Sequence, residues 1–205
     1  MSQHSARLQQ RIDSGKVKTN PTDPSPCDSG SCEPAVHTRW PRFVVDVMLG
    51  RLARWLRLAG LDTLYDPAWD DDVLLRNALR DRRILLTRDR ALARRARRMH
   101  VQVVEITADR FDAQFQQVCR QLALHPDQLP WFARCPLCNH RIRRIARKRV
   151  RDIVPEYVYR THHTFYICPS CERVYWPGSH YRKVLETRNR WQQREIHDPN
   201  RSDGT

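Results

Sequence analysis

The sequence predicts an α/β protein in which a parallel sheet covered by helices is followed by a small zinc-binding module. Four short apolar runs alternate with four helix-like segments between residues 42 and 126. This alternation, with short connections, is typical of a parallel sheet that buries both faces under helices. Two C-x-x-C pairs follow in the chain, and they predict a metal site built from sulfur ligands.

The strands of the predicted sheet are short and rich in apolar residues. They are expected at residues 43–46, 61–66, 84–87 and 101–106. The first of them, FVVD, is a continuous apolar run that ends in a carboxylate, which indicates a buried strand.

The helices between these strands carry start and stop residues. Gly60 is expected to end the first helix as the residue after its C-cap, where the chain turns left-handed. The acidic residues that open the segment 70–82 suit the positive end of a helix dipole. Asp89 is expected to cap a third helix, and Asp109 precedes a fourth.

The first helix, residues 48–59, is predicted to be amphipathic. At about 100° per residue its apolar side chains share one face; these are Leu49, Leu52, Ala53, Leu56 and Ala59. Arg51, Arg54 and Arg57 then line the opposite face, as a solvated surface or as contacts for a partner.

The two ends of the chain have a different composition. Residues 1–41 are polar and rich in proline, so we expect a disordered leader in which Cys27 and Cys32 are unstructured thiols. The expected domains are the α/β domain at 42–126 and the zinc module at 132–181. A basic helix and a frayed tail are expected at 182–205, the helix beginning near Ser179.

The charge of the chain restricts the classes of partner. Its 205 residues carry 37 Lys and Arg against 23 Asp and Glu, a formal charge of +14. Such a protein attracts polyanions, of which nucleic acid is the commonest in a cell. No apolar stretch approaches the roughly 18 residues of a membrane span, and the N-terminus lacks the apolar core of a secretory signal. We therefore expect no membrane partner, and a basic surface without any partner is the alternative.

The cysteines predict one zinc ion. Cys135 and Cys138 form the first C-x-x-C pair, and Cys168 and Cys171 form the second. Two such turns supply four thiolates for a closed tetrahedral site, which is structural and not catalytic. Paired thiolates in a chain without a secretory signal indicate a reducing compartment, so a cytoplasmic location is expected.

The segment between the two cysteine pairs mixes cations with aromatic residues. Residues 141–151 are mostly basic, and several aromatic residues follow within a segment expected to be rich in β-strand, with Tyr157, Val158 and Tyr159 in one strand. Cations interleaved with aromatics suit phosphate contact and base stacking, although the same aromatics can form the small core of a zinc ribbon.

Carboxylates recur where the predicted strands end. Asp46 follows the first strand, Asp66 or the cluster 70–72 the second, Asp89 the third and Asp109 the fourth. Ligands of a parallel sheet bind beyond the carboxyl ends of its strands, and converging carboxylates favour Mg²⁺ or Mn²⁺. In a basic protein such a cation would activate water and stabilise the charge of a phosphodiester being cut. Helix capping explains each acid singly, but it explains Asp46 least well.

Taken together, these segments resemble the Mut-seven C-terminal RNase domain family, a PIN-like nuclease fold fused to a zinc ribbon. The resemblance rests on VVDVMLGRLARWLRLAGLDTLY, DDDVLLRNAL, RRILLTRDRALARR, CPLCN and CPSCERVYWPGSHY, in that order. It implies a three-layer α/β/α PIN-like domain with an acidic, divalent-metal nuclease site. Carried over by motif, the catalytic acids are Asp46, Asp71 and Asp89. Asp72 can exchange roles with Asp71, and Asp109 is a further candidate.

The leading hypothesis is therefore a ribonuclease that uses Mg²⁺ or Mn²⁺. The arginines expected to contact RNA are Arg51, Arg54, Arg57, Arg94, Arg95, Arg98, Arg143 and Arg147. The rival hypotheses are a non-catalytic RNA-binding module and a ribosome-associated adaptor that uses the ribbon. The oligomeric state is left open by the sequence.

Overall fold

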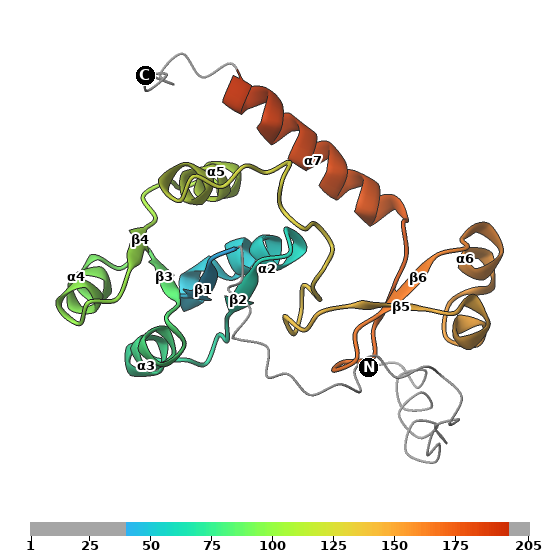
Figure 1. The fold of residues 1–205 in the computed structure, drawn as a ribbon, viewed down its shortest axis with the longest axis horizontal. Helices are drawn as coiled ribbons and strands as arrows, with labels where there is room; N and C mark the ends of the chain where they lie inside the picture. Colours follow the sequence, from blue (N-terminus) through green and yellow to red (C-terminus); the bar gives the residue numbers. More distant parts are fainter. Residues whose placement is uncertain (1–39, 197–205) are drawn as a thin grey trace, which may run out of the picture. The chain divides into compact units, whose positions relative to one another are not determined.

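The computed structural model of the chain describes residues 40–196 (Figure 1). Residues 1–39 of the expected leader, with Cys27 and Cys32, and residues 197–205 of the expected tail lie outside these residues. None of the helices in the described part combines the length and the apolar character that a membrane crossing requires.

A four-stranded parallel sheet forms the centre of residues 42–126, which we call the α/β region. Its strands are β1 (Arg42–Val45), β2 (Asp62–Leu64), β3 (Ile84–Thr87) and β4 (Val103–Glu105), in the order β2-β1-β3-β4. All three neighbouring pairs are parallel, as the alternation of strands and helices predicts. β1 and β3 are as long as the apolar runs that predict them, whereas β2 and β4 are shorter.

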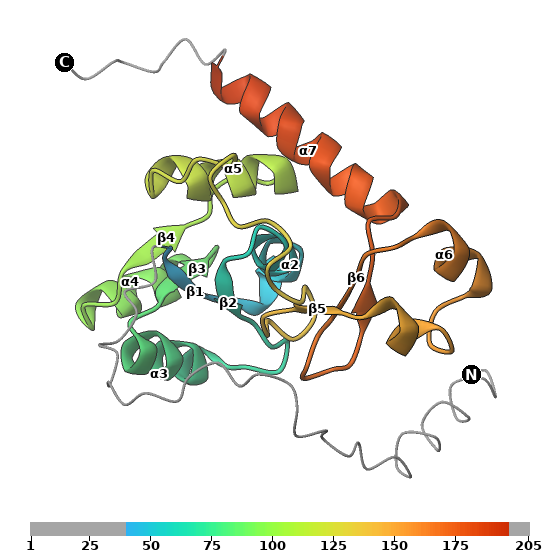
Figure 2. The same ribbon diagram turned by 45° about the vertical axis from the view of Figure 1, so that its right-hand side comes forward.

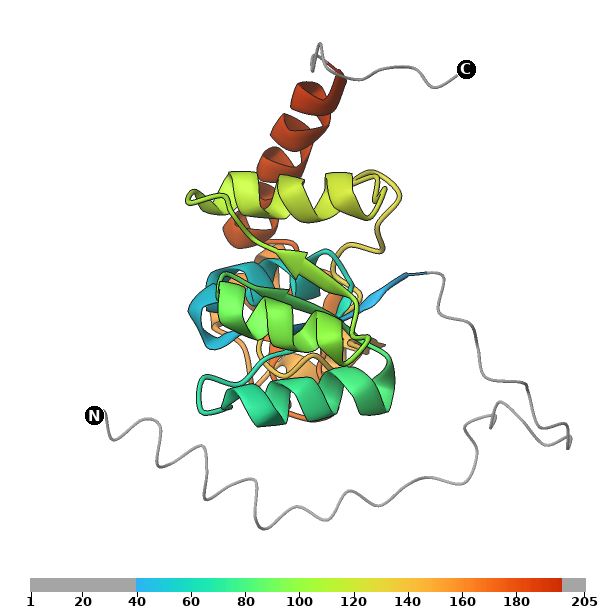
Figure 3. The same ribbon diagram turned by 90° about the vertical axis from the view of Figure 1, so that its left-hand side faces the viewer.

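Helices cover both faces of the sheet, which gives three layers (Figure 3). Successive strand residues point to opposite faces, so Phe43 and Val45 of β1 enter one apolar cluster and Val44 enters the other. The first cluster contains helices α2 (Gly50–Leu58) and α5 (Phe111–Gln121). The second contains α3 (Asp71–Asp81) and α4 (Arg90–Arg98). The sheet is therefore buried on both sides.

The helix boundaries follow the predicted start and stop residues. The side chains of Asp70 and Asp89 accept hydrogen bonds from the first backbone N–H groups of α3 and α4. Gly60 follows the C-cap of α2 with φ of +84°, and a Cβ there would lie 2.1 Å from the carbonyl oxygen of Pro130. Only glycine fits this position, because both the backbone conformation and the close approach exclude a side chain.

The cysteine module, residues 132–181, has its own small sheet and core. Its antiparallel strands are β5 (Arg143–Ile145), β6 (Phe165–Ile167) and β7 (Val174–Tyr175). Between β5 and β6 lie a short 3₁₀ helix, η2 (Arg147–Val150), and α6 (Glu156–Thr161). The prediction of a strand at residues 157–159 is therefore wrong. Residues 157–159 are part of helix α6, and Val158 joins Val154 and Phe165 in the small core of the module.

The cysteine module covers the free edge of β2. The backbone N–H of Thr63 donates to the side-chain oxygen of Asn139 at 3.1 Å. Asn139 thus takes the place of the backbone carbonyl that a neighbouring strand would offer. Asn139 also donates to Asp62 at 2.9 Å, and Arg134 of the module pairs with the same carboxylate at 3.2 Å. These contacts satisfy polar groups that an edge strand leaves open.

The last helix, α7 (Ser179–Ile196), packs into the α/β region and is not a separate basic element. Figure 2 shows it leading from the cysteine module toward α5. Trp191 is 2% exposed within the first apolar cluster, and its ring stacks on Phe115 with centroids 4.3 Å apart. Trp55 and Phe111 also contact it. The helix therefore completes the core from outside the predicted domain boundary.

We predict that Trp191→Ala lowers the free energy of unfolding by about 3–5 kcal/mol, the range for removing a large buried aromatic side chain. Urea unfolding followed by circular dichroism measures the change. Glu186→Ala, an exposed position of the same helix, is the matched control and should shift the midpoint little. Equal stability of the two variants would show that α7 does not contribute to the core.

Candidate functional site

The ends of β1 and β3 meet at the point where the strand order reverses. The connection after β1 leads to α2 on one face, whereas the connection after β3 leads to α4 on the other. Adjacent strands whose connections leave on opposite faces form a crevice at the carboxyl edge of the sheet. Asp46 follows β1 at this edge, and Thr87 and Asp89 end β3 and begin α4.

Asp46 is a buried carboxylate, 5% exposed. Its backbone N–H donates to Leu86 at 3.0 Å and so extends the ladder between β1 and β3. Thr87 donates its hydroxyl hydrogen to the Asp46 carboxylate at 2.6 Å. Within residues 40–196, no lysine or arginine forms an ion pair with this carboxylate. A buried charge without a paired cation is costly, and in proteins it commonly marks a metal or catalytic position.

Thr87 links Asp46 to Asp89. Its hydroxyl donates to Asp46 and accepts a hydrogen bond from the backbone N–H of Asp89 at 2.9 Å. The Asp89 carboxylate in turn accepts from two N–H groups at the start of α4, at 2.6 and 3.0 Å. Sequence reasoning did not assign Thr87 a role. A hydroxyl at the last position of an otherwise apolar strand was the signal that could have identified it.

Asp71 responds to the charges of both other acids. Its pKa is raised above the ordinary 3.8, first by partial burial and then by the negative charges of Asp89 and Asp46. Asp71 begins α3, directly after the connection from β2. The carboxylates of Asp46 and Asp89, which are predicted to share a site with Asp71, therefore act on it electrostatically, although they lie on other elements of the fold.

The two reserve candidates are neutralised by arginine. Asp72 pairs with Arg95, and Asp109, which is largely exposed, pairs with Arg88 at 2.5 Å. The structure thus distinguishes Asp71 from Asp72, whose roles the sequence alone leaves interchangeable. Asp71 faces acidic groups, whereas Asp72 faces a cation.

The acids are not drawn together as tightly as metal ligands. Within the described part of the chain, the four cysteines form the one group of three or more His, Cys, Asp or Glu side chains close enough for a metal ion. Asp46, Asp71 and Asp89 do not form such a group, although the negative charges of Asp89 and Asp46 add to partial burial in raising the pKa of Asp71.

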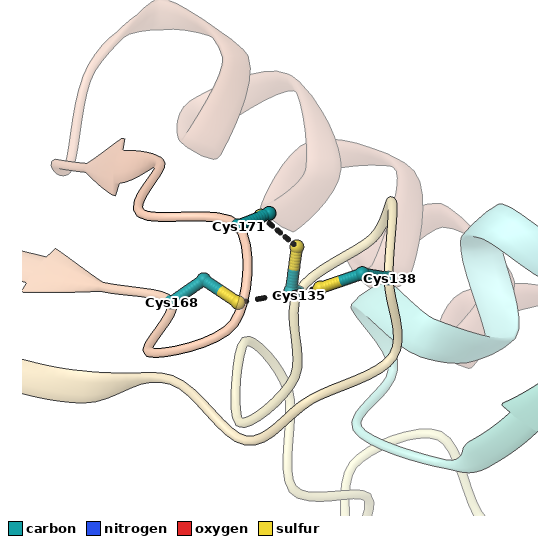
Figure 4. A group of neighbouring side chains, drawn as sticks. All are labelled: Cys135, Cys138, Cys168 and Cys171. Atoms are coloured by element: carbon teal, nitrogen blue, oxygen red, sulfur yellow. Dashed lines mark hydrogen bonds between the residues drawn. The ribbon is translucent and has the colours of Figure 1, made fainter. Parts of the chain in front are cut away.

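The four cysteines are placed to bind a metal ion such as zinc (Figure 4). Their sulfur atoms all lie within 4.8 Å of one another, with the pairs Cys138–Cys168 at 3.3 Å and Cys135–Cys171 at 3.6 Å. A tetrahedron with Zn–S distances of about 2.3 Å has S–S edges of about 3.8 Å. The spacing and the donor type both fit zinc.

The two C-x-x-C turns have the same backbone geometry. Asn139 and Glu172, each directly after the second cysteine of its pair, have φ of +69° and +57°. Each donates its N–H to the carbonyl of the first cysteine of its pair, at 3.0 and 2.9 Å. The turns are thus formed by main-chain hydrogen bonds that aim both thiols of a pair to one side.

The environment of the thiols differs within the cluster. Burial would raise the pKa of Cys135, but hydrogen bonds from the Tyr175 hydroxyl and from the backbone of Cys138 and Leu137 lower it to about 6. Burial, together with the neighbouring thiols, raises the pKa of Cys171 to about 12. Several thiolates in one small volume repel one another, so they ionise together only beside a cation.

Arg57 does not face solvent, so the prediction that it lines the exposed face of the first helix with Arg51 and Arg54 is wrong. It is 6% exposed and donates to the carbonyl oxygens of Thr63 at 2.9 Å and Leu137 at 2.6 Å. Burial lowers its pKa, while the nearby Cys135 and Cys138 oppose this. Its guanidinium therefore connects α2 and β2 to the first C-x-x-C turn.

The other predicted RNA contacts divide into two groups. Arg147 is half-buried, donates to the Tyr159 carbonyl at 2.7 Å and lies over the Tyr159 ring at 4.2 Å, so it supports the module's own core. Arg95 pairs with Asp72. The remaining predicted arginines are exposed; these are Arg51, Arg54, Arg94, Arg98 and Arg143.

Comparison with known proteins gives one match. A family model described as the Mut7-C RNAse domain matches residues 41–188. Neither the curated proteins nor the solved structures gave a significant match.

We predict that the purified chain contains one zinc ion and that Cys168→Ser loses it, because three thiolates and a hydroxyl no longer complete the S₄ site. The zinc content per chain is measured by inductively coupled plasma mass spectrometry. Cys119→Ala, which removes a thiol from α5, is the control and should keep the metal. An unchanged zinc content in Cys168→Ser would exclude this site.

We also predict that Asp71 ionises at a pH above 3.8, and that Asp89→Asn moves its titration down, because it removes a nearby negative charge. Carboxyl ¹³C shifts recorded against pH measure both values. Asp127→Asn, an exposed acid of the linker, should leave the Asp71 titration in place. A midpoint unaffected by Asp89→Asn would mean that the two acids do not share one site.

Proposed function

The chain belongs to the Mut7-C RNAse domain family, and we propose that it hydrolyses phosphodiester bonds of RNA with a divalent cation. In this proposal Asp46, Asp71 and Asp89 hold Mg²⁺ or Mn²⁺ at the carboxyl edge of the sheet. Residues 42–126 form a PIN-like nuclease domain and residues 132–181 a zinc ribbon. The strand order β2-β1-β3-β4, with acids at the strand ends, supports the fold assignment.

The unpaired carboxylate of Asp46 is the observation that carries this proposal. It is buried, it has Thr87 as its hydrogen-bond donor, and no cation of the described residues neutralises it. Asp109 and Asp72, by contrast, each have an arginine. A site that leaves its most buried acid without a cation is suited to binding one from solution.

Each acid has a distinct part in holding the cation. Thr87 fixes the orientation of Asp46, and the N–H groups of α4 fix that of Asp89. Asp71 lies on the first turn of α3 and is exposed, so it can move toward a bound ion. A divalent cation held here supplies charge stabilisation and water activation for hydrolysis. It also offsets the repulsion that raises the pKa of Asp71.

The exposed arginines suit the RNA backbone. Arg94 and Arg98 lie one turn apart on α4, the helix that Asp89 caps. Arg51 and Arg54 lie on α2, which follows Asp46 after one short turn. Phosphate contacts of this kind position a strand without reading its sequence, and they make binding sensitive to salt.

The cysteine module is proposed to hold RNA beside the catalytic region. Arg143 and the basic segment after it are exposed, and Tyr157 of α6 is 73% exposed. Zinc keeps this surface in place, because Arg57 and Asn139 connect the first C-x-x-C turn to β2. Reduced thiolates at the site are consistent with a cytoplasmic location.

A non-catalytic RNA-binding protein is the second candidate. Asp89 accepts hydrogen bonds from the start of α4, and a helix cap alone would explain it. This candidate predicts salt-sensitive RNA binding without turnover, unaffected by divalent cations.

We predict that the wild type cuts single-stranded RNA when Mn²⁺ is added, and that Asp46→Asn slows this at least about a hundredfold. Loss of a residue that only orients a metal ligand already costs about 10–100-fold, and Asp46 is proposed as a ligand itself. Gel assays of labelled RNA, with and without Mn²⁺, measure the rate. Asp127→Asn is the control and should cut at the wild-type rate. Cleavage by Asp46→Asn at the wild-type rate would remove Asp46 from the site, and wild-type binding without cleavage would favour the second candidate.

A further inference from the structure

A groove runs along the outer side of α3. It has a volume of about 610 Å³ and is lined by Trp69, Val73, Arg76, Asn77, Leu79 and Arg80. The lining residues recur every three or four positions, so they form one continuous stripe along the helix. Asp71 stands at the start of this helix, two residues after Trp69. The groove therefore begins at the same end of α3 as Asp71, but on the side of the helix opposite the buried Leu74, Leu75 and Ala78.

Trp69 forms a fixed aromatic wall of this groove. Its side chain is half-buried and packs against the apolar cluster beneath α3 and α4 while it also lines the groove. The backbone around it is held by a hydrogen bond from its N–H to Asp66 and by the Asp70 cap of α3. A ring whose position is already fixed by packing loses little entropy on binding a ligand.

The far part of the groove is cationic. No carboxylate of residues 40–196 lies within ion-pair distance of Arg76, which is exposed, whereas Arg80 shares its charge with Asp81 at 2.8 Å. At about 1.5 Å rise per residue, Arg76 lies about 7 Å along the helix axis from Asp71. The charge thus changes from negative at the acids to positive along the groove.

This order of groups fits a nucleotide. An aromatic ring accepts any base by stacking, and an unpaired arginine beyond it accepts a phosphate. The base therefore belongs at Trp69, and the phosphate of the same nucleotide lies toward Arg76.

We propose that the α3 groove binds an unpaired nucleotide of the RNA strand outside the acidic site, with its base stacked on Trp69. The inference rests on the proposed function, because that function identifies RNA as the nucleic acid that is bound. Stacking in this groove sets the distance between one unpaired base and the acids, and so selects single-stranded over duplex RNA.

The test uses two substitutions of the same residue. Trp69→Phe keeps an aromatic ring, whereas Trp69→Leu keeps apolar packing without a ring that stacks. The substrates are single-stranded RNA oligonucleotides in which an abasic site is moved one position at a time. Met99→Ala, a partly exposed apolar position after α4, is the control for general loss of surface, and thermal unfolding checks that every variant is folded.

In the wild type and in Trp69→Phe, one abasic position should raise KM roughly fivefold to tenfold with kcat nearly unchanged, as expected for one lost base–aromatic stack. Trp69→Leu should show the raised KM with the complete RNA and should not respond to that abasic position. Met99→Ala should behave as the wild type. A profile of abasic sites that is the same in Trp69→Leu and the wild type overturns the inference and leaves the ribonuclease intact.

A binding measurement keeps the inference testable if the chain does not cut RNA. Without added divalent cation, 2-aminopurine placed at each position of the oligonucleotide should be quenched at one position by the wild type and by Trp69→Phe, but not by Trp69→Leu. This result supports the groove even if the proposed activity fails. Equal quenching in all three overturns it. So does a change in sedimentation on Trp69→Leu without any change in the RNA measurements, which would assign the groove to a second copy of the chain.

Discussion

The pairing of β1 with β3 is the constraint on which the candidate site depends. The register places Val45 opposite Leu86, and the ladder continues through the N–H of Asp46 to the Leu86 carbonyl. This register brings the Thr87 hydroxyl to the Asp46 carboxylate and the Asp89 N–H to the same hydroxyl. A slip of one residue would turn Asp46 to the other face of the sheet. Burial of both faces under helices makes such a slip costly, so the packing of the core holds the acids in place.

The edge strand β2 couples the two regions of the chain. Asp62 accepts hydrogen bonds from Arg83 of the α/β region and from Arg134 and Asn139 of the cysteine module. Burial opposes its ionisation, but these partners outweigh it and hold its pKa below the ordinary 3.8. The stability that Asp62 adds is therefore present at neutral pH and lost as the pH falls below about 4. The cysteine module thereby supports the edge of the sheet, and Asp46 and Asp89 follow other strands of the same sheet. Binding of zinc would hold this module together.

Local patterns predicted most of the fold and part of the candidate site. The apolar runs, the caps at Asp70 and Asp89 and the glycine at Gly60 placed the strands and helices of the α/β region, because these signals act over a few residues. The cysteine cluster was predicted from its spacing alone. Features that depend on distant contacts were missed. Arg57 looks like a surface residue until the C-x-x-C turn supplies its carbonyl partners, and Trp191 enters a core formed by residues far earlier in the chain. Tyr157–Tyr159 has strand-forming residues but packs as a helix, since tertiary contacts outweigh local preference.

The acidic site connects these observations, because its residues come from three parts of the sequence that only the sheet topology brings together. We propose that Asp46, Asp71 and Asp89 bind one divalent cation or a close pair. A crystal of the chain grown with Mn²⁺ and measured for anomalous scattering tests this most directly. We predict a manganese peak between these carboxylates, with Mn–O distances of about 2.0–2.3 Å. Saturating Mn²⁺ without a peak there, and with the three carboxylates as far apart as before, would contradict it.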